Sequence, residues 1–116
     1  MSVHPSESVA TASVLVVADD LIWASRLAAA VERAGATVVR HGGDVAVVDL
    51  NGRGYDGIEA VARAAGAGLP TIAVGQHEDV ALRKRALAAG ARRVFSYNKM
   101  FTDGPRVIAD LAAGRL

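Results

Sequence analysis

The hydrophobic positions of the chain form short continuous runs that alternate with segments of helical spacing. Strands that are apolar on both faces and alternate with helices are typical of a parallel sheet covered on both sides. Spacing and breaker residues set the expected boundaries. We predict strands at 13–20, 36–40, 44–50, 69–75 and 91–97, and helices at 21–35, 57–68, 79–90 and 102–114.

The ends of two predicted helices carry residues suited to their positions. Asp79 can cap the helix at 79–90, and Gly90 can stop it. The closing helix is predicted to begin with Thr102 or Asp103 as its cap, which places Pro105 in the first turn.

The connection between 36–40 and 44–50 is too short for a regular α/β pattern. Only His41, Gly42 and Gly43 separate the two runs, whereas a crossover between parallel strands needs roughly a dozen residues. Either 36–40 is not a full sheet strand, or the glycines close a hairpin and the pair is antiparallel. We favour a short or irregular edge segment, with 44–50 parallel to the first strand.

Length and composition narrow the class of protein. At 116 residues, with 52% hydrophobic residues, the chain suits one domain, expected over 13–116 after a polar tail at 1–12. A net charge of +1 argues against a general nucleic-acid binder, and the absence of Cys excludes disulfides and thiolate metal sites. We see neither a signal-peptide pattern nor a run that could span a bilayer, so we expect a cytoplasmic protein.

Acidic residues follow two of the predicted strands. Asp19 and Asp20 come after the first strand, and Asp49 lies near the end of 44–50, before a loop with three glycines. If these strands are neighbours, the carboxylates converge at the sheet edge where ligands bind in open parallel sheets. Converging negative charges favour a hard divalent cation such as Mg²⁺. An Asp carboxylate can also act as a nucleophile, which makes Asp49 a candidate phosphoryl acceptor.

Four segments together resemble the receiver domain of two-component response regulators: VLVVADD, VVDLNGRGYDGIE, LPTIAVG and LAAGARRVF. The resemblance covers nearly everything from Val14 onward. It implies a three-layer flavodoxin-like (CheY-like) sandwich, with helices on both faces of a parallel sheet of roughly four to five strands.

The same resemblance implies a function in a phosphorelay and no independent enzyme activity. Asp49 would accept the phosphoryl group, and Mg²⁺ would be held by Asp19, Asp20, Asp49 and the main-chain carbonyl of Asn51. Asp56, followed by glycine, matches the start of the next helix in the family. The implied partners are a sensor histidine kinase or phosphotransfer protein and a downstream protein, with a homodimer as a further option.

The sequence departs from the family where the phosphoryl group would be sensed. The family helix between the second and third strands is missing. Gly75 stands where the family has a hydroxyl residue, and Tyr97 stands where the family lysine falls without gaps. Lys99, two residues later, is the candidate replacement for the phosphate contact. The alternative function is therefore a pseudo-receiver, which acts as a phosphorylation-independent protein-interaction module.

Two surface features lie outside this pattern. Helical spacing places Ala24, Leu27 and Val31 in the core, so Trp23 is expected on an exposed face with Arg26. An exposed Trp suggests a contact with a partner or with the N-terminal tail. A basic group is expected to be a solvated surface, with a docking surface as the minority alternative: Arg83, Lys84, Arg85, Arg92 and Arg93.

Overall fold

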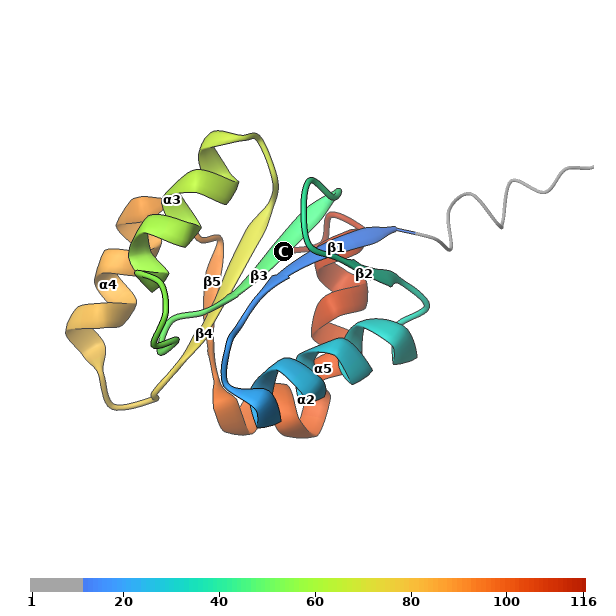
Figure 1. The fold of residues 1–116 in the computed structure, drawn as a ribbon, viewed down its shortest axis with the longest axis horizontal. Coiled ribbons are helices and arrows are strands. Elements are labelled where there is room, and N and C mark those ends of the chain that lie inside the picture. Colours follow the sequence, from blue (N-terminus) through green and yellow to red (C-terminus); the bar gives the residue numbers. More distant parts are fainter. Residues whose placement is uncertain (1–11) are drawn as a thin grey trace, which may run out of the picture.

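The computed structural model describes residues 12–116, so the predicted tail at 1–12 lies almost wholly outside the described residues. Figure 1 shows the sheet with α3 and α4 on one side and α2 and α5 on the other. The elements in chain order are β1 (Ser13–Val17), α2 (Leu21–Arg33), β2 (Thr37–Val39), β3 (Val45–Asp49), α3 (Gly57–Gly66), β4 (Thr71–Gly75), α4 (Val80–Ala89), β5 (Arg93–Ser96) and α5 (Tyr97–Ala112).

The strands form one five-stranded sheet in the order β2-β1-β3-β4-β5, and every neighbouring pair is parallel. The predicted three-layer α/β architecture is confirmed. All residues of β3 and β4 are buried, because helices cover both faces of the sheet centre. The carboxyl ends of β1 and β3 therefore lie side by side at one edge of the sheet.

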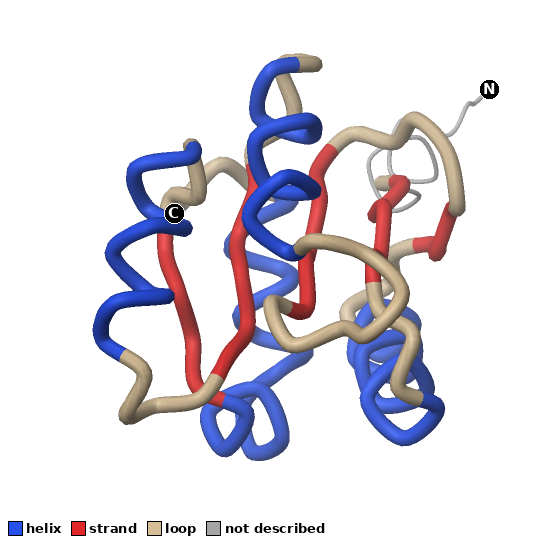
Figure 2. The backbone as a smooth tube through the Cα atoms, turned by 60° about the vertical axis from the view of Figure 1, so that its left-hand side comes forward, coloured by secondary structure: helices blue, strands red, loops and turns tan. Residues whose placement is uncertain are grey.

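The short connection between β2 and β3 crosses the start of β1. β2 has only three residues and ends opposite Leu15, while β3 begins opposite Val14. The connection therefore has to return by only about one residue along β1 before β3 starts. Figure 2 shows this connection as a loop that arches past the start of β1. The N–H of Asp44 donates to the carbonyl of Ser13 at 2.8 Å, which ties the loop to β1. The favoured edge strand is confirmed, and the antiparallel hairpin is wrong.

Acidic caps fix the starts of three helices, as their sequences suggest. Asp20 accepts the N–H of Trp23 at 3.0 Å in α2, and Asp79 accepts that of Leu82 at 3.1 Å in α4. Asp56 accepts N–H groups from the first turn of α3. Each cap satisfies donors that the first helical turn would otherwise leave unpaired.

The last helix begins earlier than its sequence suggests. α5 starts at Tyr97 with Ser96 as its cap, rather than at Thr102 or Asp103. The prediction is nonetheless half correct, because the backbone leaves helical geometry at Asp103 and the helix continues beyond it. Pro105 lacks an N–H and crowds the preceding turn, which accounts for the break.

Small aliphatic side chains fill the core on both faces of the sheet. On one face α2 and α5 pack with Leu27, Val31 and Ile108, which are almost fully buried. Within residues 12–116, no helix has both the length and the apolar character needed to cross a membrane.

Candidate functional site

The predicted acidic residues lie at the carboxyl edge of the sheet. Val17 at the end of β1 is in register with Val48, so Asp49 at the end of β3 lies beside the turn that carries Asp19 and Asp20. Only 1% of the surface of Asp49 is exposed, whereas the other two acids are exposed. The topology thus brings the three residues to one edge, but each carboxylate has different hydrogen-bond partners.

Asp19 anchors the loop that follows β3. Its Oδ1 accepts the N–H of Arg53 at 3.0 Å, and its Oδ2 accepts the N–H of Gly54 at 2.6 Å. A Cβ at residue 54 would lie 2.9 Å from that Oδ2, so glycine permits the close approach. The N–H groups of Gly54 and Arg53 hold the pKa of the Asp19 carboxyl below its ordinary value of 3.8.

Asp49 is held by a tyrosine hydroxyl and by a main-chain N–H. Oδ1 of Asp49 accepts hydrogen bonds from the Tyr97 hydroxyl and, at 3.1 Å, from the N–H of Asn51. The same hydroxyl lies 3.0 Å from Oδ1 of Asn51. Burial, followed by the hydrogen bond to Asp49 and its negative charge, raises the pKa of Tyr97. Tyr97 is therefore a neutral donor at ordinary pH.

A second tyrosine closes the site from the loop side. The Tyr55 hydroxyl lies 2.6 Å from the main-chain oxygen of Asp49 and 3.1 Å from that of Val17. Burial, followed by the charges of Asp49 and Asp19, raises the pKa of Tyr55. A Cβ on Gly52 would collide with the Tyr55 ring, so this glycine makes room for the tyrosine.

As they are placed, the side chains of Asp19, Asp20 and Asp49 are not gathered around one point. Asp19 uses both oxygens on the loop, Asp20 caps α2, and Asp49 is bonded to Tyr97. Among residues 12–116, no group of three or more His, Cys, Asp or Glu side chains could hold a metal ion. Each of the three carboxylates accepts at least one hydrogen bond from the chain's own N–H or O–H groups.

Lys99 follows Tyr97 by two residues on α5, and its side chain is paired elsewhere. Its Nζ forms an ion pair of 3.0 Å with Asp103, four residues along α5, and both side chains are partly exposed. Tyr97, at the start of the same helix, makes the contact with Asp49 instead. The role of Lys99 as a phosphate ligand stays a prediction.

Trp23 is partly buried against α5 rather than exposed on a free face. Its ring packs against the ring of Tyr97, with centroids 4.6 Å apart and planes at 42°. The expectation of an exposed Trp23 is wrong because the buried face of α2 is turned toward α5 and includes Ala30. The large apolar side chains left exposed here are those of Leu21, Ile22 and Phe101.

The two tyrosines are the site residues that the sequence alone did not assign. They are the only tyrosines of the chain, and both hydroxyls donate to Asp49. Tyr55 donates to its main-chain oxygen and Tyr97 to its Oδ1. Tyr97 carried a signal, because it stands in place of a lysine. Tyr55 carried none beyond its position in a glycine-rich loop.

The comparisons with known proteins concern the fold. No protein-family model and no curated protein matches the sequence. Solved structures do match the fold. A response regulator receiver protein from Burkholderia phymatum is 24% identical with a TM-score of 0.73, over 89% of this chain and 96% of that one. A CheY-like receiver domain protein from Methanospirillum hungatei is 18% identical with a TM-score of 0.77, over 90% and 96%.

A third similar structure contains a modified aspartic acid and a bound metal ion. It is a response regulator protein from Burkholderia pseudomallei with a phosphorylated aspartic acid, a calcium ion and citrate. The identity is 17% and the TM-score 0.70, over 89% of this chain and 69% of that one. Sequence identities below 25% support a shared fold and not a shared function. The described part of this chain has the fold of a response-regulator receiver domain.

Proposed function

We propose that this chain is a pseudo-receiver, a receiver-fold module that recognises a partner protein without phosphorylation of Asp49. The observation that carries the proposal is the hydrogen bond from the Tyr97 hydroxyl to Oδ1 of Asp49. A lysine in that place would offer a positive charge to an incoming phosphoryl group. A neutral hydroxyl instead bonds to one of the two carboxylate oxygens and brings no positive charge.

The surroundings of Asp49 support the same reading. The carboxylate is almost fully buried, and its Oδ1 also accepts the N–H of Asn51. β4 ends in Gly75, which has no hydroxyl to follow a phosphoryl group. A modification can shift a conformational equilibrium only through contacts that differ between the two states. With Gly75 and Tyr97 in place, the chain has neither the hydroxyl residue nor the lysine at the two family positions.

The exposed apolar side chains at the starts of α2 and α5 are the proposed docking surface. Leu21 and Ile22 are 87% and 62% exposed, and Phe101 is 61% exposed. The guanidinium of Arg26 lies over the ring of Phe101 at 4.6 Å and over that of Trp23 at 5.2 Å. This surface suits a partner protein with an apolar helix face. The resemblance implies a sensor histidine kinase or phosphotransfer protein.

The second candidate function is a receiver that is phosphorylated on Asp49 with Mg²⁺ bound. It is favoured by the position of Asp49 beside Asp19 and Asp20 at the carboxyl edge, and by the phosphorylated aspartic acid and calcium ion of the Burkholderia pseudomallei structure. In this function a phosphoryl group and Mg²⁺ would share the carboxylates with the bonds from Tyr97 to Asp49 and from the loop to Asp19.

Amide NMR of the protein titrated with Mg²⁺ and beryllofluoride, a phosphoryl mimic, separates the two functions. The pseudo-receiver predicts no saturable shifts in the 49–56 segment of the wild type. The Tyr97→Lys variant supplies the charge that the family pattern has, and Tyr97→Phe is its uncharged control. A saturable wild-type response that disappears in Asp49→Asn would contradict the proposal.

A further inference from the structure

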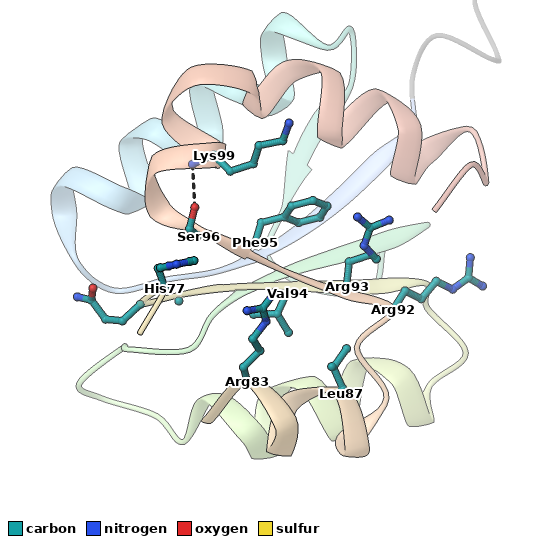
Figure 3. A pocket seen from close by; sticks show the side chains of 11 residues that line it. His77, Arg83, Leu87, Arg92, Arg93, Val94, Phe95, Ser96 and Lys99 are labelled. Carbon is teal, nitrogen blue, oxygen red and sulfur yellow. Dashed lines mark hydrogen bonds between the residues drawn. The ribbon is translucent and has the colours of Figure 1, made fainter. Parts of the chain in front are cut away.

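A basic hollow lies along β5, the last strand of the sheet; its lining includes Gly75 and Lys99 but not Asp49. It has a volume of about 490 Å³ and is formed by α4, β5, the start of α5 and the loop after β4. Figure 3 shows Arg83 and Leu87 reaching from α4 toward β5, with Ser96 and Lys99 on the side of α5. None of the residues that hold Asp49 lines this hollow.

The charged side chains that line the hollow are all basic. Arg83, Arg92, Arg93 and Lys99 line the hollow together with His77, and its lining includes no Asp or Glu. This concentration stands out in a chain whose net charge is +1. Such a group of like charges is costly unless an anion or the solvent compensates it.

Two of these cations have neither an ion pair nor a hydrogen bond from the side chain within residues 12–116. Lys99 is paired with Asp103, and the guanidinium of Arg92 donates to the main-chain oxygen of Leu116 at 3.0 Å. Within the described part of the chain, Arg83 and Arg93 form no ion pair. The guanidinium of Arg93 lies over the ring of Phe95 at 5.4 Å, which holds it beside the strand.

The hollow also has an apolar side. Side chains alternate along a strand, so Val94 packs toward α3 and α4, while Phe95 packs toward α2 and α5. Leu87 of α4 is 45% exposed beside Val94. A ligand in this place would meet guanidinium groups and, next to them, aliphatic carbon.

From these contacts we propose that the hollow binds a small molecule that carries a diphosphate group. Guanidinium groups pair with phosphate oxygens through two parallel hydrogen bonds. Arg83 reaches the hollow from the α4 side of β5 and Arg93 from the α5 side (Figure 3), and neither forms an ion pair within residues 12–116. The volume falls within the range of small-molecule sites, and the cations come from three elements rather than from one flat stripe. The diphosphate is either inorganic or part of a nucleotide, whose base would lie on Leu87 and Val94.

A neighbouring hollow helps to locate the anion. It shares Gln76, His77 and Ser96 with the first and adds Glu78 and Tyr97. The carboxylate of Glu78 disfavours an anion there, so the diphosphate is placed between Arg83 and Arg93. The site is independent of the proposed function, because its occupation involves neither Asp49 nor the surface formed by Leu21, Ile22 and Phe101.

Isothermal titration calorimetry with inorganic pyrophosphate and with ADP, without added metal, tests the site. We expect saturable binding to the wild type, and a loss of about tenfold or more in affinity in Arg83→Gln and in Arg93→Gln. Arg63→Gln is the matched control, because Arg63 is an exposed arginine on α3 outside the hollow, and it should leave binding unchanged.

The two probes distinguish the source of the diphosphate. Tighter binding of ADP identifies a nucleotide that uses the apolar side, and equal binding shows that the diphosphate alone is recognised. The proposal is overturned if neither probe binds the wild type, or if Arg63→Gln weakens binding as much as the other variants. The latter result would mean that only the general charge of the surface attracts the anion.

Discussion

At the scale of single residues, Asp49 is a buried carboxylate that accepts hydrogen bonds and forms no ion pair with another residue of 12–116. The Tyr97 hydroxyl and the Asn51 N–H bond to its Oδ1, and the Tyr55 hydroxyl bonds to its main-chain oxygen. Hydrogen bonds to a charged acceptor are stronger than neutral ones, and a buried charge that loses them becomes costly. Tyr97 thus stabilises the site as it stands and keeps Oδ1 occupied.

Removal of the Tyr97 hydroxyl should destabilise the protein. Tyr97→Phe keeps the ring against Trp23 but leaves the Asp49 carboxylate with one donor fewer, so we expect a loss of about 1–3 kcal/mol in the free energy of unfolding. Urea denaturation followed by Trp23 fluorescence measures it. In an Asp49→Asn background the same change should cost less, because the acceptor is then neutral. Equal losses in both backgrounds would show that the hydroxyl acts elsewhere.

The two tyrosines should also govern stability at alkaline pH. Folding raises the pKa of both above the ordinary value of 10.0, so the folded state holds these protons more tightly than the unfolded state. Their contribution to the free energy of unfolding is complete below pH 10 and is lost as the pH rises above it. Tyrosinate absorbance should therefore appear only as the protein unfolds. A reversible titration of the native protein near pH 10 would contradict this.

At the scale of elements, the sequence predicts most of the sheet and the place of the acidic residues, but not the two tyrosines that bond to Asp49. Continuous apolar runs identified the strands because helices bury both faces of the sheet, and Asp79 identified a helix start through local chemistry. The start of α5 was missed because Ser96 caps it within an apolar run that resembles a continued strand. The face of Trp23 and the contacts of Tyr97 depend on how α5 packs on α2, which no local pattern contains.

The hydrogen bonds from the loop after β3 to Asp19 should make the free energy of unfolding depend on pH in the acid range. Because N–H groups of the loop hold the Asp19 pKa below 3.8, its contribution to stability is present above that pH and is lost as the pH falls through the lower folded value. Asp19→Asn should make the acid end of the stability curve flatter. Thermal denaturation across the acid range measures the slope, and an unchanged slope would mean that other carboxylates set it.

Two glycines of α3 should respond to alanine in opposite directions. A Cβ on Gly57 would lie 2.7 Å from main-chain atoms of Leu50, so Gly57→Ala should destabilise by about 1–3 kcal/mol through overpacking. A Cβ on Gly66 has nothing within 4 Å, so Gly66→Ala should stabilise by about 0.5–1 kcal/mol through helix propensity. Thermal unfolding of both variants compares them directly. Destabilisation of similar size by both would remove the steric explanation for Gly57.

At the scale of the whole molecule, the receiver fold separates three surfaces. The carboxyl ends of the strands hold the acidic site around Asp49. The starts of α2 and α5 expose Leu21, Ile22 and Phe101. The outer strand β5 lines the basic hollow. Trp23 links the first two, because it packs against the tyrosine that holds Asp49. In this account the chain keeps the fold of a phosphorylated switch and uses it as a stable binding platform.

The most direct test of this central claim is the intact mass of the wild-type protein after incubation with Mg²⁺ and acetyl phosphate, a small phosphoryl donor. Because Tyr97 occupies Oδ1 of the buried Asp49, we expect the mass to stay that of the unmodified chain. A mass increase of one phosphoryl group that is absent from Asp49→Asn would contradict the account and would establish Asp49 as a phosphoryl acceptor.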